Sequence, residues 1–71
     1  MDSQNKMILH HLQTHKRGIT PIQALEKYGC LRLSGRIHDL RSMGYAIETH
    51  PEEKKNRFGK TVRYARYTLE A

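Results

Sequence analysis

The sequence predicts an α+β domain in which three short helices are followed by a two-stranded antiparallel hairpin. Two observations lead to this fold class. Apolar residues recur at helical spacing up to Gly44 and alternate with polar residues after it. Gly18, Gly29 and Gly44 each follow one of the helical segments, at the place where a helix commonly ends. A chain of 71 residues is expected to form one domain, residues 1–71, with a small core.

The first helix is predicted from Ser3 to about Lys16. Ser3 is a suitable N-cap, because its hydroxyl can accept a hydrogen bond from a free amide of the first turn. Its apolar stripe is expected to consist of Met7, Ile8, Leu9 and Leu12.

The second helix has the clearest start signal. Thr20 is a predicted N-cap, Pro21 suits the first helical position, and Gln23 completes a capping box. The short stretch Gly18-Ile19 before it can pair as a brief strand. Four residues are expected to form its buried side: Ile22, Ala24, Leu25 and Tyr28.

The third helix is predicted from Leu31 to Met43. Leu33, Ile37 and Leu40 share one face and are expected in the core. The opposite and flanking positions hold small or polar residues, namely Ser34, Gly35, His38 and Ser42. A helix with such an exposed side can approach another surface closely.

The hairpin is predicted from strands at Tyr45–Thr49 and Thr61–Leu69, which are rich in β-branched and aromatic residues. Residues 51–60 between them are polar and are expected to form a long loop. The side of the second strand that faces the core with Ile47 is expected to hold Ala65, Tyr67 and Leu69.

The charge of the chain indicates a polyanionic partner. Thirteen Lys and Arg residues stand against seven Asp and Glu, and nine of these thirteen cations lie between Arg32 and Arg66. Clustered positive charge of this kind attracts nucleic acid. Cys30 is the single cysteine, which excludes an intramolecular disulfide. No apolar run approaches the length of about 18 residues that a membrane span needs. We therefore expect a cytoplasmic protein that does not bind membranes.

From Met7 to Leu69 the chain resembles the small winged helix-turn-helix domains of phage and prophage proteins. The resemblance rests on several segments: Gly18-Ile19-Thr20, Ala24-Leu25-Glu26-Lys27-Tyr28-Gly29, Leu33-Ser34-Gly35-Arg36-Ile37-His38-Asp39-Leu40-Arg41, Gly44-Tyr45 and Tyr67-Thr68-Leu69. It implies a recognition helix, residues 31–43, in the major groove of double-stranded DNA. It also implies that the loop 51–60 is a wing that contacts the backbone or the minor groove. The expected role is that of a transcriptional regulator, or of an accessory factor in recombination or replication, in a bacterial or phage-infected cell.

The candidate DNA-binding residues fall into three groups. The recognition helix offers Arg32, Ser34, Gly35, Arg36, His38 and Arg41. The wing offers Lys54, Lys55, Asn56, Arg57 and Lys60, and the second strand adds Arg63. Thr20, at a helix N-terminus, is a candidate phosphate contact.

Some of these candidates have a structural alternative. Arg36 and Asp39 are spaced for an ion pair within the helix, and Arg41 suits a phosphate contact and a structural pairing equally. Glu52 and Glu53 restrict the expected wing contact to its distal part.

Other classes of function have little support. His10, His11 and His15 are best explained as a polar surface of the first helix, so no metal site or cofactor is expected. Cys30, His38 and Asp39 do not have the spacing of a catalytic triad, so we expect no enzyme activity. The rival function is an interaction protein that uses a winged-helix surface to bind or inhibit a host protein. A monomer or a weak homodimer is expected, since no additional dimerisation helix is present.

Overall fold

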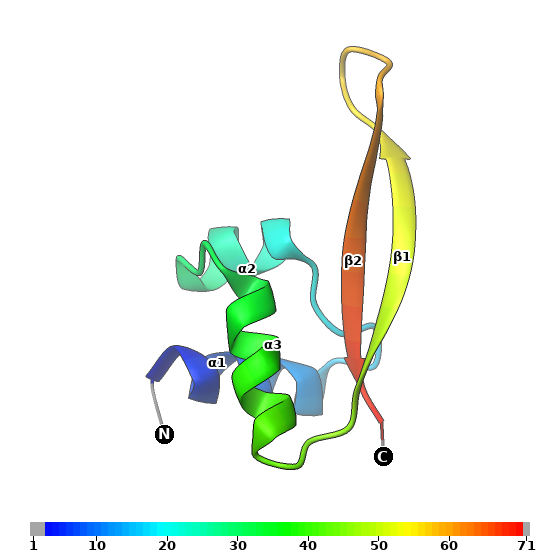
Figure 1. Ribbon diagram of the computed structural model, residues 1–71. Helices are drawn as coiled ribbons and strands as arrows, with labels where there is room; N and C mark the ends of the chain where they lie inside the picture. The colour runs from blue at the N-terminus through cyan, green and yellow to red at the C-terminus, as the bar shows by residue number, and fades with distance from the viewer. Residues whose placement is uncertain (1–2, 71) are drawn as a thin grey trace.

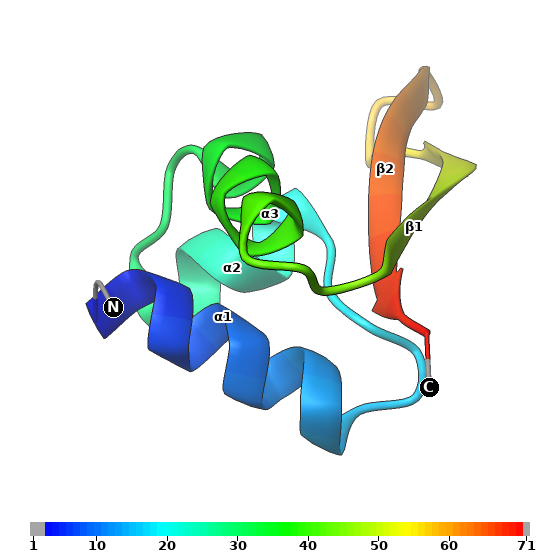
Figure 2. The same ribbon diagram turned by 60° about the horizontal axis from the view of Figure 1, so that its bottom comes forward.

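The computed structural model describes residues 3–70 and has the predicted order of elements. The helices are α1 (Ser3–Thr14), α2 (Pro21–Tyr28) and α3 (Leu33–Ser42), and the strands are β1 (Ile47–Lys55) and β2 (Thr61–Leu69). The three helices pack together, and the hairpin stands beside them with its far end projecting beyond the helical part (Figures 1 and 2). None of the helices in residues 3–70 is long and apolar enough to cross a membrane.

Helix α1 supplies one side of the core through Ile8, Leu9 and Leu12, as predicted, whereas Met7, which was predicted to belong to the same stripe, is 38% exposed. Ser3 lies inside the helix, so its predicted role as the preceding N-cap is wrong; the position before it is outside the described residues. The helix ends at Thr14 rather than Lys16. The chain then turns through Gly18, whose φ of 69° is unfavourable for other residues and whose amide donates to the carbonyl of His15.

Helix α2 begins with the predicted capping box. The Thr20 hydroxyl accepts a hydrogen bond from the Gln23 amide, and the Gln23 side chain accepts one from the Thr20 amide. The prediction of its buried side is wrong in part. Ala24 is buried and Tyr28 packs against the core, whereas Ile22 is 59% exposed and Leu25 is 42% exposed.

Helix α3 is shorter than predicted and begins at Leu33. Arg32 is the residue that precedes the helix, and it makes no side-chain capping bond. Leu33, Ile37 and Leu40 are buried against α1 and the hairpin base, as their spacing predicts. The helix stops at Ser42, and the chain reverses through Gly44 to reach β1.

The hairpin is longer, and its loop shorter, than predicted. The two strands pair antiparallel from Ile47 opposite Leu69 to Lys55 opposite Thr61, which leaves only residues 56–60 as the loop. The expected loop 51–60 is therefore wrong for residues 51–55, which belong to β1. Pro51 is tolerated because its missing amide falls on the outer edge of β1, where no ladder bond is required.

The short strand predicted before α2 is confirmed at Ile19, which exchanges two backbone hydrogen bonds with Tyr67. This bridge ties the start of α2 to β2. Tyr67 and Leu69 pack against the core, and Ile47 is buried, as predicted; Ala65 is half-buried. The buried apolar residues of the core are Ile8, Leu9, Leu12, Ile19, Ala24, Cys30, Leu33, Ile37, Leu40 and Ile47.

Candidate nucleic-acid interface

The exposed face of α3 is small and open. Arg32, Ser34 and His38 are exposed, as the sequence predicted. No atom lies within 4 Å of the position that a Cβ at Gly35 would occupy, so a side chain at this position would face open space. The N-terminal end of α3 lies on the side of the molecule toward which the hairpin projects (Figure 1).

Arg36 points toward α1 rather than away from the protein. One guanidinium nitrogen lies 3.4 Å from the Asn5 side-chain oxygen and 3.8 Å from the Asp39 carboxylate. The Asn5 amide nitrogen in turn donates to Asp39, and Asn5 is buried. The sequence predicts the Arg36–Asp39 pair but not the contact with Asn5, because nothing in the sequence marks a polar residue of α1 as buried. These contacts fix α3 against α1.

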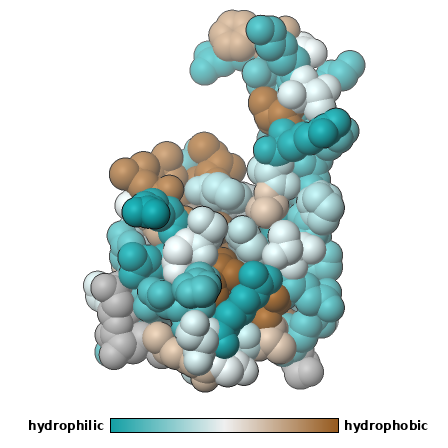
Figure 3. All heavy atoms as spheres, viewed as in Figure 1, coloured by the Kyte–Doolittle hydropathy of each residue, from teal (hydrophilic) through white to brown (hydrophobic). Residues whose placement is uncertain are grey.

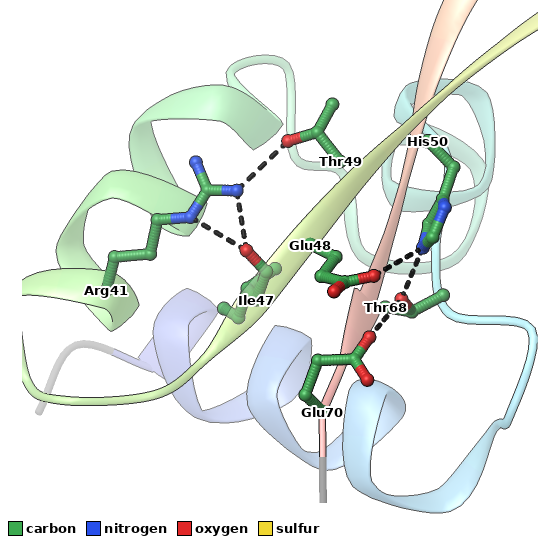
Figure 4. A network of polar contacts seen from close by, with 7 residues as sticks. All are labelled: Arg41, Ile47, Glu48, Thr49, His50, Thr68 and Glu70. Carbon is green, nitrogen blue, oxygen red and sulfur yellow. Dashed lines mark hydrogen bonds and ion pairs between the residues drawn. The ribbon is translucent and has the colours of Figure 1, made fainter.

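Arg41 joins α3 to β1 (Figure 4). Its Nε and Nη2 atoms donate to the carbonyl oxygen of Ile47, at 3.1 and 2.7 Å, and Nη2 also donates to the Thr49 hydroxyl. The sequence allowed Arg41 either a phosphate contact or a structural pairing, and in the structure it makes the structural pairing. The contact sets the position of the hairpin relative to the exposed face of α3.

The end of the hairpin, here called the wing tip (residues 54–60), is shaped by Asn56. Its side-chain oxygen accepts hydrogen bonds from the amides of Phe58 and Lys60, and its own amide donates to the Lys60 carbonyl. This Asx turn organises the loop locally. The Arg57 guanidinium lies 5.6 Å from the centre of the Phe58 ring, within cation–π range.

Four cations of the wing tip are exposed and have no acidic partner within residues 3–70: Lys54, Lys55, Arg57 and Lys60. Arg63 differs, because its Nε lies 2.9 Å from the Glu53 carboxylate. Both groups of that pair are largely exposed, and such surface pairs contribute less than about 1 kcal/mol. Because the Glu53 carboxylate lies beside it, Arg63 adds less net charge to the hairpin than the wing tip cations do.

Glu52 is neutralised lower on the hairpin. Its carboxylate accepts a hydrogen bond from Arg66 at 2.8 Å, and this bond lowers the pKa of Glu52 and raises the pKa of Arg66. Arg66 also donates to the carbonyl of Arg17, which connects β2 to the turn after α1. The positive charge that remains unbalanced on the hairpin is thus concentrated at the wing tip.

Thr20 has little surface to offer a phosphate. Thr20 is 3% exposed, and its hydroxyl already accepts a hydrogen bond in the capping box. The structure therefore gives Thr20 a local role at the start of α2, and does not bring it together with the exposed cations of the wing tip.

The prediction that His11 belongs to a polar surface of the first helix is wrong. His11 is 2% exposed, its Nδ1 lies 2.8 Å from the Tyr28 hydroxyl, and its Nε2 lies 3.1 Å from the carbonyl oxygen of Gly18. The ring of His15 stacks on it at 3.9 Å. Burial first, and then the neighbouring His15, lowers the pKa of His11. His11 is thus a core residue that connects α1, α2 and the turn between them.

A second group of cations, which the sequence analysis did not single out, surrounds a hollow of about 350 Å³. Lys16 and Arg17 come from the turn after α1, Lys27 from α2, and Arg66 from β2. They are spread over more than 40 positions of the sequence, so no local charge run could reveal them. None of them belongs to the exposed face of α3 or to the wing tip.

Among residues 3–70, one group of three side chains that could ligate a metal comes together at the base of the hairpin. The ligand atoms of Glu48, His50 and Glu70 all lie within 4.8 Å of one another. The Thr68 hydroxyl lies among them, 2.8 Å from His50 Nε2, and donates to Glu70 (Figure 4). These hydrogen bonds and the 3.6 Å contact between His50 and Glu48 make the group a polar network across the two strands.

One of three comparisons with known proteins, the comparison with family models, supports this architecture. No significant match was found among curated proteins or among solved structures. A family model described as a winged helix-turn-helix domain matches residues 3–71, nearly the whole chain. Its defining parts are present here: three helices, of which the third has an exposed face, and a hairpin that stands beside them. The chain therefore belongs to the winged helix-turn-helix domain family.

Proposed function

We propose that this domain binds double-stranded DNA, with the N-terminal half of α3 in the major groove and the wing tip against the backbone or the minor groove. The observation that carries the proposal is the arrangement of two surfaces. The N-terminal end of α3 and the wing tip lie toward the same end of the molecule (Figure 1), and the four wing tip cations have no acidic partner within residues 3–70. The major groove is about 12 Å wide and admits one α-helix, while lysine and arginine bind phosphate.

The residues divide between reading bases and binding the backbone. Arg32 can bond two acceptors on a guanine edge, Ser34 and His38 can reach bases or phosphates, and Gly35 permits close approach. In the wing tip, Lys54, Lys55, Arg57 and Lys60 supply phosphate contacts, and Arg63 extends them along β2.

Four other candidates act through the fold in this proposal. Arg36 and Arg41 position α3 and the hairpin through the contacts described above. Thr20 caps α2, and Asn56 shapes the turn that presents the wing tip cations. None of these four needs to touch DNA for the interface to form.

The biological setting rests on the resemblance to phage and prophage domains. It favours a regulator of transcription, or an accessory factor in recombination or replication, that acts as a monomer or weak homodimer.

Selection of bound duplexes from a random pool tests the proposal. The native protein should enrich a defined site. Arg32→Ala should relax the preference at one base pair, since a bidentate contact discriminates by about 1–3 kcal/mol. Lys54→Ala/Lys55→Ala should weaken binding to all duplexes without changing the enriched site. Failure of the native protein to bind any duplex would reject the proposal.

A further inference from the structure

A hollow between α2 and the hairpin has an apolar floor, which the core does not use. It measures about 800 Å³ and lies between the start of α2 and the hairpin. Its floor includes Ile22 and Leu25 of α2 and Val62 of β2, together with Leu31, which is 81% exposed. Figure 3 shows hydrophobic atoms gathered at this end of the helical part, separated from the hairpin by a hollow. Several large apolar side chains that share one concave surface are typical of a binding site.

The rim of this hollow is basic. Lys54, Lys55, Arg57 and Arg63 all line it, and the first three have no acidic partner within residues 3–70. No Asp or Glu is among its lining residues. An occupant must therefore be apolar where it meets α2 and negatively charged where it meets the hairpin.

One edge of the sheet is open beside the hollow. Ile19 bonds to both backbone groups of Tyr67, so the amides and carbonyls of alternate residues of β2 face this edge, including Ala65 and Arg63. The chain turns into α2 after Thr20, and within residues 3–70 no backbone group pairs with these two residues on that side. An open strand edge is a template for an added strand.

The opposite edge of the sheet is partly blocked. On β1, Pro51 has no amide to donate, and Arg41 already occupies the Ile47 carbonyl. At Ala65 and Arg63, the β2 edge has neither a proline nor a carbonyl that is already hydrogen-bonded by a side chain. The asymmetry marks the β2 edge as the one available for pairing.

We propose that the hollow is a docking site for an acidic, extended peptide segment of a partner protein. The segment adds a strand to the open edge of β2 and places alternate apolar side chains on Ile22, Leu25 and Val62. Its carboxylates meet the basic rim. Strand addition of this kind gives affinity through backbone bonds and specificity through side-chain pockets. The basic rim is shared with the proposed DNA interface, whereas the apolar floor belongs to no residue of that interface, so substitutions in the floor test peptide binding separately from DNA binding.

A display library of short random peptides, screened against the intact protein, tests this proposal. Enriched peptides should combine Asp or Glu with apolar residues at alternate positions. Ile22→Ser/Leu25→Ser should weaken an enriched peptide about tenfold or more, since it removes two apolar contacts. Met43→Ser is the matched control, because Met43 is similarly exposed but does not line the hollow. Binding of the best peptide is measured by fluorescence anisotropy, after circular dichroism has shown that each variant is folded.

The backbone part of the proposal has its own pair of variants. Arg63→Pro removes the charge and the amide that faces the open edge, whereas Arg63→Ala removes only the charge. The peptide should bind Arg63→Pro distinctly more weakly than Arg63→Ala. Equal affinities for the two variants would reject strand addition.

Three other results would overturn the proposal. The first is the absence of enriched acidic peptides, or peptides that bind Ile22→Ser/Leu25→Ser as tightly as the native protein. The second is self-association that this double variant abolishes, which would make a second copy of the chain the occupant. The third is a loss of duplex binding in the double variant, which would make the hollow part of the DNA interface. Because duplex and peptide binding are measured separately, failure of one proposal leaves the other to its own test.

Discussion

The Tyr28 hydroxyl lies 2.8 Å from Nδ1 of His11 and binds a histidine that is almost completely buried. Nε2 of the same ring lies 3.1 Å from the Gly18 carbonyl oxygen. A neutral imidazole satisfies both contacts at once: Nε2 donates to the carbonyl, and Nδ1 accepts from the hydroxyl. Burial, with help from the adjacent His15, lowers the pKa of His11 and favours this neutral form. Protonation of His11 is therefore linked to folding, because the folded state favours the neutral ring.

The stability of the domain should fall as the pH is lowered from about 7 to about 5. The pKa of His11 is lowered in the folded state from an ordinary value of 6.5, so the unfolded chain binds more protons in this window. The stabilisation is complete above the unfolded pKa and is lost as the pH falls toward the folded one. The measurement is the free energy of unfolding by urea at several pH values.

Two variants separate His11 from the other titrating groups. His11→Gln should be less stable at neutral pH but should show a flatter profile in this window. His10→Gln, at an exposed position of the same helix, should change the profile only slightly, because His10 is the smallest of the influences that lower the pKa of His11. Glu52, whose pKa is lowered, contributes stability that is lost only at more acidic pH. Identical slopes for native protein and His11→Gln would show that His11 does not control the pH dependence.

Gly18→Ala should be among the most destabilising single changes. A Cβ at Gly18 would lie 1.7 Å from the Tyr67 carbonyl oxygen, at a φ of +69°. We expect a loss of about 3 kcal/mol or more, because strain and a backbone clash add. Gly59→Ala is the matched control, with a φ of +76° and open space around the Cβ, and should cost only about 1–2 kcal/mol. Equal losses for the two variants, measured by urea unfolding, would mean that the clash is relieved at no cost.

Gly35→Ala should separate stability from DNA binding. Its Cβ would meet no atom within 4 Å, and alanine is favoured over glycine within a helix by about 1 kcal/mol, so the domain should become more stable. In the proposed complex the same methyl group points at the DNA, so duplex affinity should fall. Thermal unfolding and duplex titration measure the two effects. A stabilised variant with native affinity would show that DNA does not approach α3 at Gly35.

Arg41→Ala should lower stability more than it changes DNA contacts. It removes the hydrogen bonds to the Ile47 carbonyl and to Thr49, which together stabilise the hairpin base by about 1–3 kcal/mol. Since the guanidinium is already engaged, the salt dependence of duplex binding should stay close to native. A native stability with a reduced salt dependence would instead assign Arg41 to phosphate contact.

The sequence predicted the elements well because their signals are local. The capping box at Thr20 and Gln23 and the spacing of Leu33, Ile37 and Leu40 each specify a helix without reference to the remainder of the fold. The spacing of apolar residues does not, however, predict which of them pack against the core. Ala24 and Tyr28 face the core, and the pair Ile22 and Leu25 is left on the outside.

Two other errors come from long-range structure. Pro51 makes residues 51–55 resemble a loop, and only the register of the hairpin shows that its missing amide falls on a free edge. In the sequence, His11 resembles a surface residue of α1. In the structure, the turn after α1 places the Gly18 carbonyl beside it as a hydrogen-bond acceptor. For the candidate site, the sequence identified the exposed residues of α3 and the wing tip cations. It predicted the capping box of Thr20 and the Arg36–Asp39 pair, but it could not show that Asn5 also contacts Arg36, or that Ile47 and Thr49 are the partners of Arg41.

The salt dependence of duplex binding tests the central claim most directly. Binding of the native protein is titrated between about 50 and 200 mM salt, beside two variants that lose the same charge, Lys54→Ala/Lys55→Ala and Lys16→Ala/Lys27→Ala. Each phosphate contact contributes about 0.9 to the slope of log affinity against log salt, so the wing tip variant should lose about 2 from the slope and the control variant almost nothing. Equal slopes for both variants, or duplex binding that does not respond to salt, would contradict the assignment of the wing tip to DNA.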